Sequence, residues 1–380
     1  MSSPAVAIPH RRRHLRAVPV PPLRVADVAL FYGGRSGGIR TYLDEKAAYA
    51  AGTGAFEHHL IVPGRQRRSA GRRHELPSVS VAGSNGYRWP LGARALAETL
   101  RRVRPDVVLL HDPFWHPHET TEVAHRLGAA VVMVHHGSVD LNAHAFPGPT
   151  GLYARAFRAW LRRAYEPADA VMAACDPWPD CGRSVTAPLR FGLHPAFRPQ
   201  PNIARRDHVL YVGRLGREKG IFELLEAAAR SREPWPLELI GAGTAGDAVA
   251  AHVRRLGLER RVSFRPYLAD RRALARAYAS ARCVVMPGAY ETFGLVAFEA
   301  AASGASTVAC ASAPSARLLG PLAHTFEPGD VAGLAAAIER ARAAEPDHVA
   351  AALLAAEHTW ARAFAAELAD LETLARGQTP

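Results

Sequence analysis

Two carboxylates eight positions apart stand out in the second half of the chain. Glu291 and Glu299 flank an apolar, glycine-containing segment that follows the turn residues 287–290. The pattern predicts a helix that begins near Phe293 and stops at Gly304. Unpaired N–H groups at such a helix start attract anions, and the two carboxylates could accept hydrogen bonds from sugar and ribose hydroxyls. The structural alternative makes Glu291 a helix-dipole acid and Glu299 a solvated helix residue.

A cationic turn occurs earlier in the same half. Arg214 and Lys219 flank a glycine-bounded turn that follows the expected strand 208–212. A guanidinium and a mobile ammonium at a strand end could neutralise a diphosphate from two sides. In isolation, the two residues could equally be surface charges.

A glycine-rich turn occupies the corresponding place near the start of the chain. Gly37 and Gly38 lie between an expected buried strand, 23–30, and a helix. A strand, a glycine turn and a helix N-terminus together can cradle phosphate. The turn does not contain the dinucleotide fingerprint Gly-x-Gly-x-x-Gly, and a flexible turn without a ligand remains the alternative.

Histidines follow the apolar run 130–134. Its near-continuous hydrophobicity predicts a strand covered on both faces, and ligands bind at the carboxyl ends of such strands. His136 is the first candidate for a ligand-contacting residue and His135 is the competing register, while a histidine satisfied by loop carbonyls is the structural alternative. His111, at the end of the preceding apolar run, is a weaker candidate for the same cleft.

The elements that must position these residues form two series. Length and repeated strand–helix alternation predict an α/β protein with two domains. The expected divisions are a disordered basic arm over 1–22, a first domain over 23–190, a proline-rich linker over 191–206, a second domain over 207–355, and a final helix over 356–380.

The charge favours anionic partners. Lysine and arginine number 47 against 35 acids, which gives a formal net charge of +12. Nucleotides, nucleic acid and acidic lipid all fit this balance. A nucleic-acid platform would need basic residues interleaved with aromatics on one face, whereas Arg214 and Lys219 fall at a strand-end turn. We therefore expect no nucleic-acid partner.

Two basic segments bear on a membrane contact. The arginine-rich segment 64–74 and the basic amphipathic segment 152–163 are compatible with an anionic membrane surface. A solvated loop and a core-packed helix are the alternatives. The four cysteines lack zinc or redox spacing, and no apolar run reaches the length of a membrane span. We expect a cytoplasmic protein, with peripheral contact at the inner membrane face as the open question.

The segment from Glu291 to Glu299 and the turn from Arg214 to Lys219 resemble the signatures of the retaining family-4 glycosyltransferases. The resemblance implies the GT-B fold, in which two Rossmann-like domains face each other across a cleft. It implies that 23–190 is the acceptor-side domain, that 207–355 binds the nucleotide sugar, and that the final helix crosses back to pack on the first domain. It assigns catalytic roles to Glu291, His136, Arg214 and Lys219. The donor-binding residues it implies are Gly37, Gly38, Arg214, Lys219, Arg265, Phe293, Gly294, Leu295 and Glu299.

The resemblance also implies a reaction, namely transfer of a hexose from a nucleotide diphosphate sugar with retention. No Asp-x-Asp motif is present, so we expect no metal and no cofactor. The run 31–41 looks like that of actinobacterial mannosyltransferases of phosphatidylinositol mannoside synthesis, which implies GDP-mannose and a glycan or lipid-linked acceptor. A UDP-sugar donor and a non-catalytic sugar-nucleotide sensor are the alternatives. Departures from the family pattern at Phe191–His194, Pro266 and 312–316 leave the base and sugar open.

Overall fold

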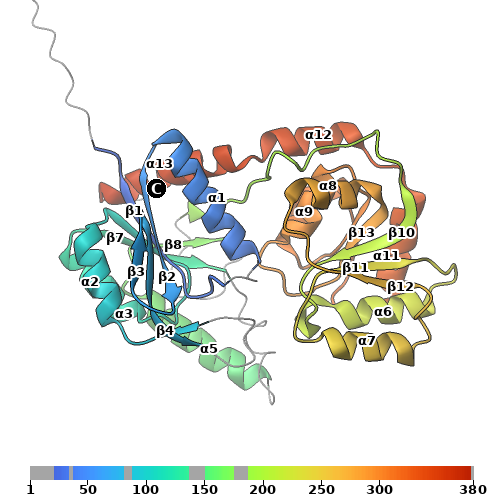
Figure 1. Cartoon of the computed structure of the whole chain (residues 1–380), viewed down its shortest axis with the longest axis horizontal. Coiled ribbons are helices and arrows are strands. Elements are labelled where there is room, and N and C mark those ends of the chain that lie inside the picture. The colour runs from blue at the N-terminus through green and yellow to red at the C-terminus, as the bar shows by residue number, and fades with distance from the viewer. Residues whose placement is uncertain (1–20, 34–36, 81–87, 137–149, 175–186, 378–380) are drawn as a thin grey trace, which may run out of the picture.

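The computed structural model describes residues 21–33, 37–80, 88–136, 150–174 and 187–377. Two α/β units lie side by side, each built around a largely parallel sheet (Figure 1). The two Rossmann-like units that the family resemblance implies are confirmed. The predicted basic arm lies almost wholly outside the described residues.

The first sheet has nine strands in the order β3-β4-β2-β1-β6-β7-β8-β9, with β5 paired to β4. Hydrophobic residues alternate between its two faces, so that Val25 of β1 packs on one side and Ala26 on the other. The strands are β1 (Arg24–Val28), β2 (Glu57–Gly64), β3 (Arg68–Ala70), β4 (Arg73–Ser80), β5 (Arg88–Pro90), β6 (Val107–Leu110), β7 (Ala130–His135), β8 (Ala170–Ala173) and β9 (Ala187–Pro188).

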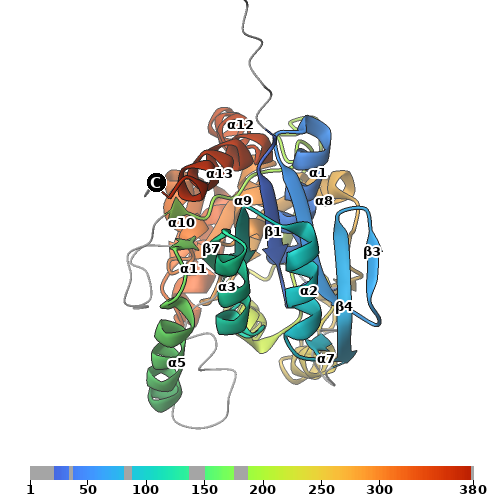
Figure 2. The same cartoon turned by 90° about the vertical axis from the view of Figure 1, so that its left-hand side faces the viewer.

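Helices cover both faces of the first sheet (Figure 2). Buried residues of α2, α3 and α5 pack on one face, and those of α1 pack on the other together with the last helix of the chain. The bounds are α1 (Gly38–Thr53), α2 (Arg94–Val103), α3 (Pro117–Arg126) and α5 (Thr150–Tyr165).

The second sheet is wholly parallel in the order β12-β11-β10-β13-β14-β15. Helices α6, α7 and α11 cover one face, and α8, α9 and α10 pack on the other. The elements are β10 (Arg206–Val212), η1 (Arg217–Lys219), α6 (Ile221–Arg230), β11 (Leu237–Ile240), α7 (Gly246–Arg255), β12 (Val262–Arg265), α8 (Arg271–Ser280), β13 (Ala281–Met286), α9 (Leu295–Ala302), β14 (Thr307–Cys310), α10 (Pro314–Leu319), η2 (Gly320–Leu322), β15 (Ala323–Phe326) and α11 (Val331–Ala343).

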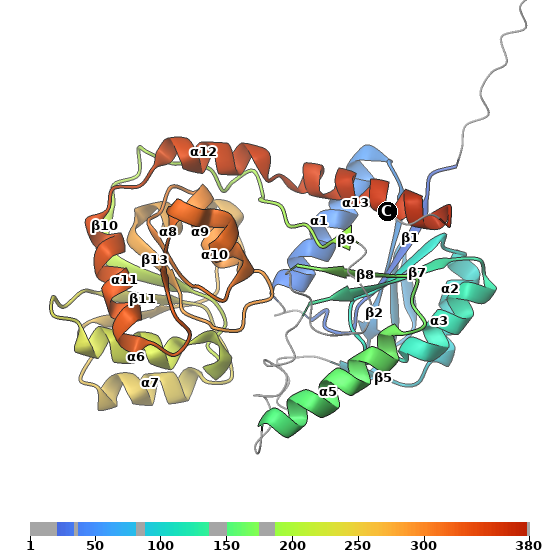
Figure 3. The ribbon, with the colours of Figure 1, turned by 180° about the vertical axis from the view of Figure 1, so that it is seen from behind.

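The chain crosses between the units twice. Helix α12 (His348–Glu357) runs along the second unit, and α13 (Trp360–Ala375) runs along the first (Figure 3). At the junction Leu193 of the outgoing linker forms a β-bridge with Thr359 of the returning chain. A Cβ added at Gly192 would lie 2.3 Å from the backbone nitrogen of Trp360, so glycine permits the close approach of the two crossings.

The arginine-rich segment differs from the solvated loop or anion-binding loop expected there. Residues 68–70 and 73–80 pair as antiparallel strands β3 and β4 at the sheet edge. Charged side chains are a common feature of such edges because they discourage pairing with other chains. Arg67 contacts Glu98 and Arg72 contacts Glu57, so these two guanidinium groups already have acidic partners.

The basic helix packs partly in the core. In α5, Leu161 is buried, and the ring of Trp160 stacks on Phe114 at a centroid distance of 4.9 Å. Leu152, near the start of the helix, is 63% exposed. None of the helices in the described part of the chain is long and apolar enough to cross a membrane.

Candidate functional site

Sheet topology brings together residues that are predicted to contact the nucleotide sugar, at the edge of the second sheet where its parallel strands end. Strand β10 lies between β11 and β13, and all three run parallel. Because the carboxyl ends of parallel strands meet at one edge, the turn after β10 lies beside the segment after β13. That arrangement places Arg214 and Lys219 next to the segment that carries Glu291.

Lys219 and Glu291 form an ion pair at this edge. The ammonium nitrogen Nζ of Lys219 lies 2.9 Å from each carboxylate oxygen of Glu291. Both side chains are partly buried, and the backbones around them pack closely. A Cβ at Gly220, whose φ is +67°, would lie 2.5 Å from the carbonyl oxygen of Pro287. The cation is therefore held on a carboxylate in a tightly packed turn.

Arg214 is also paired with an acid. Its Nη2 lies 2.6 Å from Oε1 of Glu218 in the same turn, and Tyr211 Oη donates a 2.7 Å hydrogen bond to its carbonyl oxygen. Its Nε is buried and has no hydrogen-bond partner within the described residues. A buried donor without an acceptor is costly.

The helix expected to begin near Phe293 begins two residues later. Gly294 precedes α9 with φ +96°, and a Cβ there would lie 2.3 Å from Oγ of Ser315. Phe293 instead stacks on Phe191 of the linker, with ring centroids 4.5 Å apart. The first N–H groups of α9, from Leu295 onward, lack acceptors inside the helix and carry its positive dipole end.

The first unit meets this edge through two contacts. Thr292 Oγ1 donates a hydrogen bond to the carbonyl oxygen of His136. A Cβ at Gly38 would approach Cδ1 of Leu295 to 3.3 Å. The predicted residues His136 and Gly38 are thus brought against the segment 292–295. Gly37 is the residue just before α1, and the preceding residues 34–36 lie outside the described chain.

The two candidate histidines have different surroundings. His135 Nδ1 lies 2.9 Å from Tyr165 Oη within the first unit. His136 Nε2 lies 2.7 Å from His111 Nδ1, and the two rings stack. Burial, followed by the neighbouring His111 and His135, holds the pKa of His136 well below its ordinary value. His136 is therefore neutral at physiological pH and adjoins the second unit.

Glu299 does not share the ion pair of Lys219 and Glu291 but has partners of its own. It is buried, which excludes the alternative of a solvated helix residue. Tyr278 Oη donates a 3.2 Å hydrogen bond to its carboxylate, and Arg271 Nη1 lies 3.5 Å from it. Burial raises the pKa of Glu299 to about 7, although Arg271 and Tyr278 oppose the shift. Arg271 also donates to Thr41 of α1 at 3.1 Å, so Glu299 lies near the interface between the units.

The contacts of Arg265 do not connect it to Lys219 or Glu291. Its guanidinium lies 3.1 Å from Glu238, and its carbonyl oxygen accepts a hydrogen bond from the backbone nitrogen of Gly241. A role in holding the nucleobase stays a prediction.

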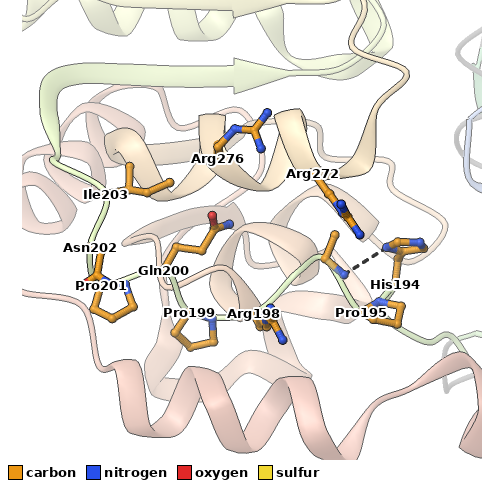
Figure 4. Close-up of a pocket in the computed structure, with 11 residues that line it drawn as sticks. His194, Pro195, Arg198, Pro199, Gln200, Pro201, Asn202, Ile203, Arg272 and Arg276 are labelled. Carbon is orange, nitrogen blue, oxygen red and sulfur yellow. Dashed lines mark hydrogen bonds between the residues drawn. The ribbon is translucent and has the colours of Figure 1, made fainter.

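A sizeable cavity lies away from these strand-end residues. It has a volume of about 590 Å³ and is bordered by residues 194–203 of the linker and by α8. In Figure 4 the side chains of Arg198, Arg272 and Arg276 do not converge on one point. A cavity without convergent polar groups gives no indication of a specific ligand, so we place the candidate site at the strand ends instead.

The described residues contain no metal-binding cluster. Among them, no group of three or more histidine, cysteine, aspartate or glutamate side chains is arranged to hold a metal ion. Metal independence stays a prediction.

Sequence reasoning missed several residues of this region. Thr292 lies inside the recognised signature, yet its contact depends on how the two units face each other. Asp27 offered a signal, because it is a charged residue among the apolar residues Val25, Ala26 and Val28 of its strand. It is fully buried beside His111, with Nε2 of that histidine 2.5 Å from its Oδ1.

Family models match both halves of the chain. The model described as Glycosyltransferase Family 4 matches residues 36–178, and the model described as Glycosyl transferases group 1 matches residues 195–351. A GDP-mannose-dependent alpha-(1-6)-phosphatidylinositol dimannoside mannosyltransferase of Mycobacterium tuberculosis is 31% identical over 308 residues, which cover 75% of this chain and 79% of that protein. A glycogen synthase of the same species is 31% identical over 63% of this chain and 61% of its own length.

Solved structures share the fold at lower identity. Sucrose-phosphate synthase from Thermosynechococcus elongatus superposes with a TM-score of 0.71 at 19% identity, covering 93% of this chain and 98% of that one. Anabaena HepE in complex with UDP-glucose gives a TM-score of 0.69 at 18% identity, covering 93% and 99%. With both halves matched by the family models and a relative similar over most of its length, this chain belongs to the family-4 glycosyltransferases and is a glycosyltransferase of GT-B fold.

Proposed function

We propose that this chain transfers mannose from GDP-mannose, with retention of configuration, to a hydroxyl of a glycolipid or other glycan. The observation that carries the proposal is the pairing of Lys219 with Glu291 at the strand ends, directly beside the Thr292–His136 contact between the units. Two cations, a carboxylate that can accept hydrogen bonds from sugar hydroxyls, and a neutral imidazole would then lie where a sugar diphosphate spans the two units.

The choice of donor is supported by the mycobacterial mannosyltransferase, whose similarity covers three quarters of this chain. The alternative is a UDP-sugar. A solved structure of the same fold, Anabaena HepE, holds UDP-glucose. The donor must therefore be identified by measurement.

The residues at the edge suit departure of a diphosphate. As the bond between the sugar C1 and the phosphate oxygen breaks, its electron pair passes to the diphosphate. Lys219, Arg214 and the first N–H groups of α9 would stabilise the developing charge. The turn holds both cations before the donor arrives, so less reorganisation is needed during the reaction. These cations would take the place of a metal.

The acceptor hydroxyl would attack from the face on which the diphosphate leaves. A new bond forms between its oxygen and C1, and its proton passes to a departing phosphate oxygen. Glu291 would accept hydrogen bonds from the sugar hydroxyls, and neutral His136 would contact the same sugar. Glu299 would bind the nucleotide ribose.

A lipid-linked acceptor would bring the enzyme to the inner face of an anionic membrane as a peripheral cytoplasmic protein. The formal net charge of +12 supports this location. The exposed Leu152 on the basic helix α5 also supports it. Arg67 and Arg72, near β3, support this location less, because each already has an acidic partner.

A thermal-shift panel of GDP-, UDP- and ADP-sugars tests the donor base. The GDP-sugar should raise the unfolding temperature most, because bound ligand stabilises the folded state. Incubation with that donor and extracted lipids should then release free nucleoside diphosphate, and the product should retain the donor's anomeric configuration. A larger shift with UDP-sugars would replace the proposed donor. Binding without release would indicate a sensor.

A further inference from the structure

A series of hydrogen-bonded residues, Asp27, His111 and His136, runs from the first sheet to the interface between the units. Nε2 of His111 lies 2.5 Å from Oδ1 of Asp27, and Nδ1 of His111 lies 2.7 Å from Nε2 of His136. Asp27 and His111 are each at most 1% exposed. The carbonyl oxygen of His136 contacts Thr292 of the second unit, so the chain ends at the candidate site.

At the end of this series of hydrogen bonds that lies away from the second unit, Asp27 is held by other charged groups. Nζ of Lys46 lies 3.0 Å from Asp27 and 2.7 Å from Glu367 of α13. Tyr42 Oη donates a hydrogen bond to Glu367 as well. Asp27 also contacts His58, whose Nε2 lies 2.6 Å from Oδ2. All these groups are buried, and burial at this depth is tolerated only when charges are paired.

We propose that Asp27 and His111 are positioning residues for His136, fixing its ring orientation and the nitrogen that carries its proton. This inference rests on the proposed contact of His136 with the donor sugar. Asp27 accepts a hydrogen bond from Nε2–H of His111, which leaves Nδ1 of His111 as an acceptor. His136 then donates through Nε2. Its Nδ1 presents a lone pair to a sugar hydroxyl.

The electrostatic surroundings agree with this assignment. Burial alone would raise the pKa of Asp27, but Lys46, His111 and His58 hold it well below its ordinary value, so the acceptor stays ionised. The titratable and charged groups around His136 and its hydrogen-bonded partners are Asp27 from β1, Tyr42 and Lys46 from α1, His58 from β2, His111 and Asp112 after β6, His135 from β7 and Glu367 from α13.

A purely structural role would be shared by all partners of Asp27. His58 and His111 both contact Asp27 through Nε2, and both are buried. Only His111 also contacts His136. The two histidines therefore form a matched pair. Glutamine can place its amide near the Nε2 position of histidine, so His111→Gln and His58→Gln both keep a donor for Asp27, whereas only His111→Gln loses the contact with His136.

The experiment compares kcat, donor KM and the pH profile of both variants with those of the unaltered enzyme. His111→Gln should lower kcat by roughly 10- to 100-fold, as loss of an outer-shell partner does at other sites, with donor KM changed little. Its acid limb should move to higher pH, because glutamine cannot carry the positive charge with which a protonated His111 depresses the pKa of His136 as the pH falls. His58→Gln should change kcat by less than about threefold and leave the limb in place.

Two further variants separate the possible failures. His136→Ala tests the underlying function: if it retains full activity, the role of His136 itself is wrong. If His136→Ala is inactive while His111→Gln matches His58→Gln in kcat and pH profile, the positioning inference is wrong and the proposed function stands. Melting temperature and nucleotide binding report folding. Should His111→Gln unfold, His111→Asn keeps an amide near the Nδ1 position and loses the bond to Asp27, and the same drop and limb shift are expected.

Discussion

Thr292 of the second unit donates its hydroxyl proton to the carbonyl oxygen of His136 in the first. The contact joins the segment carrying Glu291 to the strand end of the opposite unit. Its presence therefore depends on how the two units close on each other.

Replacing Thr292 by valine keeps its shape and removes this donor. A typical hydrogen bond contributes about 1 kcal/mol, so Thr292→Val should lower kcat/KM for the donor by about fivefold. Ser312→Ala is a matched control, because Ser312 Oγ donates to the carbonyl oxygen of Ala289 within one unit at 2.7 Å. Steady-state kinetics of both variants check the prediction. Equal losses in the two variants would contradict it.

Removing the cation at Lys219 should weaken stabilisation of the departing diphosphate. Lys219→Ala should reduce kcat by roughly 10²- to 10³-fold, the range found for loss of one charge-stabilising group. Arg217→Ala is the control. Arg217 belongs to the same turn, but its guanidinium lies over the ring of Phe222, 4.7 Å from the centroid. Full turnover in Lys219→Ala would show that the ammonium plays no electrostatic role in the reaction.

Glu291→Gln tests recognition of the sugar. The change keeps the shape of the side chain but removes the charge that pairs with Lys219. Turnover should fall at least about tenfold, while nucleoside diphosphate affinity stays within about threefold, since the nucleotide does not need this carboxylate. Glu223→Gln, on the exposed surface of α6, serves as the control. Parallel losses of turnover and nucleotide affinity in Glu291→Gln would place Glu291 at the nucleotide instead.

Glu299 should release protons when a nucleotide binds. Burial raises its pKa to about 7, so part of the free enzyme carries a protonated Glu299 at neutral pH. Ribose hydroxyls that donate to the carboxylate favour its ionised form and lower the pKa. Titration calorimetry of nucleoside diphosphate at pH 7 in two buffers of different ionisation enthalpy should show net release, and Glu299→Gln should abolish it. Identical proton release by the variant would assign it to another group.

The same pKa shift makes a prediction about stability. A carboxyl whose pKa is higher in the folded than in the unfolded chain favours folding below the unfolded pKa, and that contribution is lost as the pH rises through the folded value. The contribution of Glu299 should therefore decline between about pH 4.5 and pH 7. Glu299→Gln should flatten this part of the curve of melting temperature against pH. An unchanged slope would mean that Glu299 ionises alike in both states.

Gly294 should tolerate no side chain. Its φ of +96° and the distance of 2.3 Å that would separate an added Cβ from Ser315 Oγ combine strain with a clash. Gly294→Ala should destabilise the fold by about 1–3 kcal/mol from backbone strain alone. Gly246→Ala, at the start of α7 with 4.0 Å to the nearest side-chain atom, should be neutral or stabilising. Denaturant unfolding of both variants provides the comparison.

Local patterns predicted what depends on local structure. Strand-end turns carry Arg214, Lys219 and Glu291, and parallel topology alone brings them to one edge. The start of α9 was placed two residues early because Gly294 adopts a left-handed conformation, with φ +96°, that does not belong to the helix. The strand at 68–70 and the first part of the strand 73–80, of which only the end near Ser78 was expected, were missed because arginines at a sheet edge do not show the hydrophobic alternation of a half-buried strand.

Long-range pairing could not be read from the sequence. Asp27 and His111 are 84 positions apart, and Tyr42 and Glu367 are 325 apart. Their contacts depend on β1 lying beside β6 and on α13 returning to α1, which no local spacing encodes. A lone aspartate between apolar neighbours in β1 was the available signal. It indicates a buried partner but does not identify it.

The bridge between Leu193 and Thr359 has a mechanical consequence. Because the outgoing and returning segments touch where they cross, the two units share a double hinge rather than a single tether. Opening of the enzyme would then resemble the swing of a door about one fixed edge. Sliding or twisting of one unit past the other would require this junction to come apart, so we expect the units to open by rotation about it.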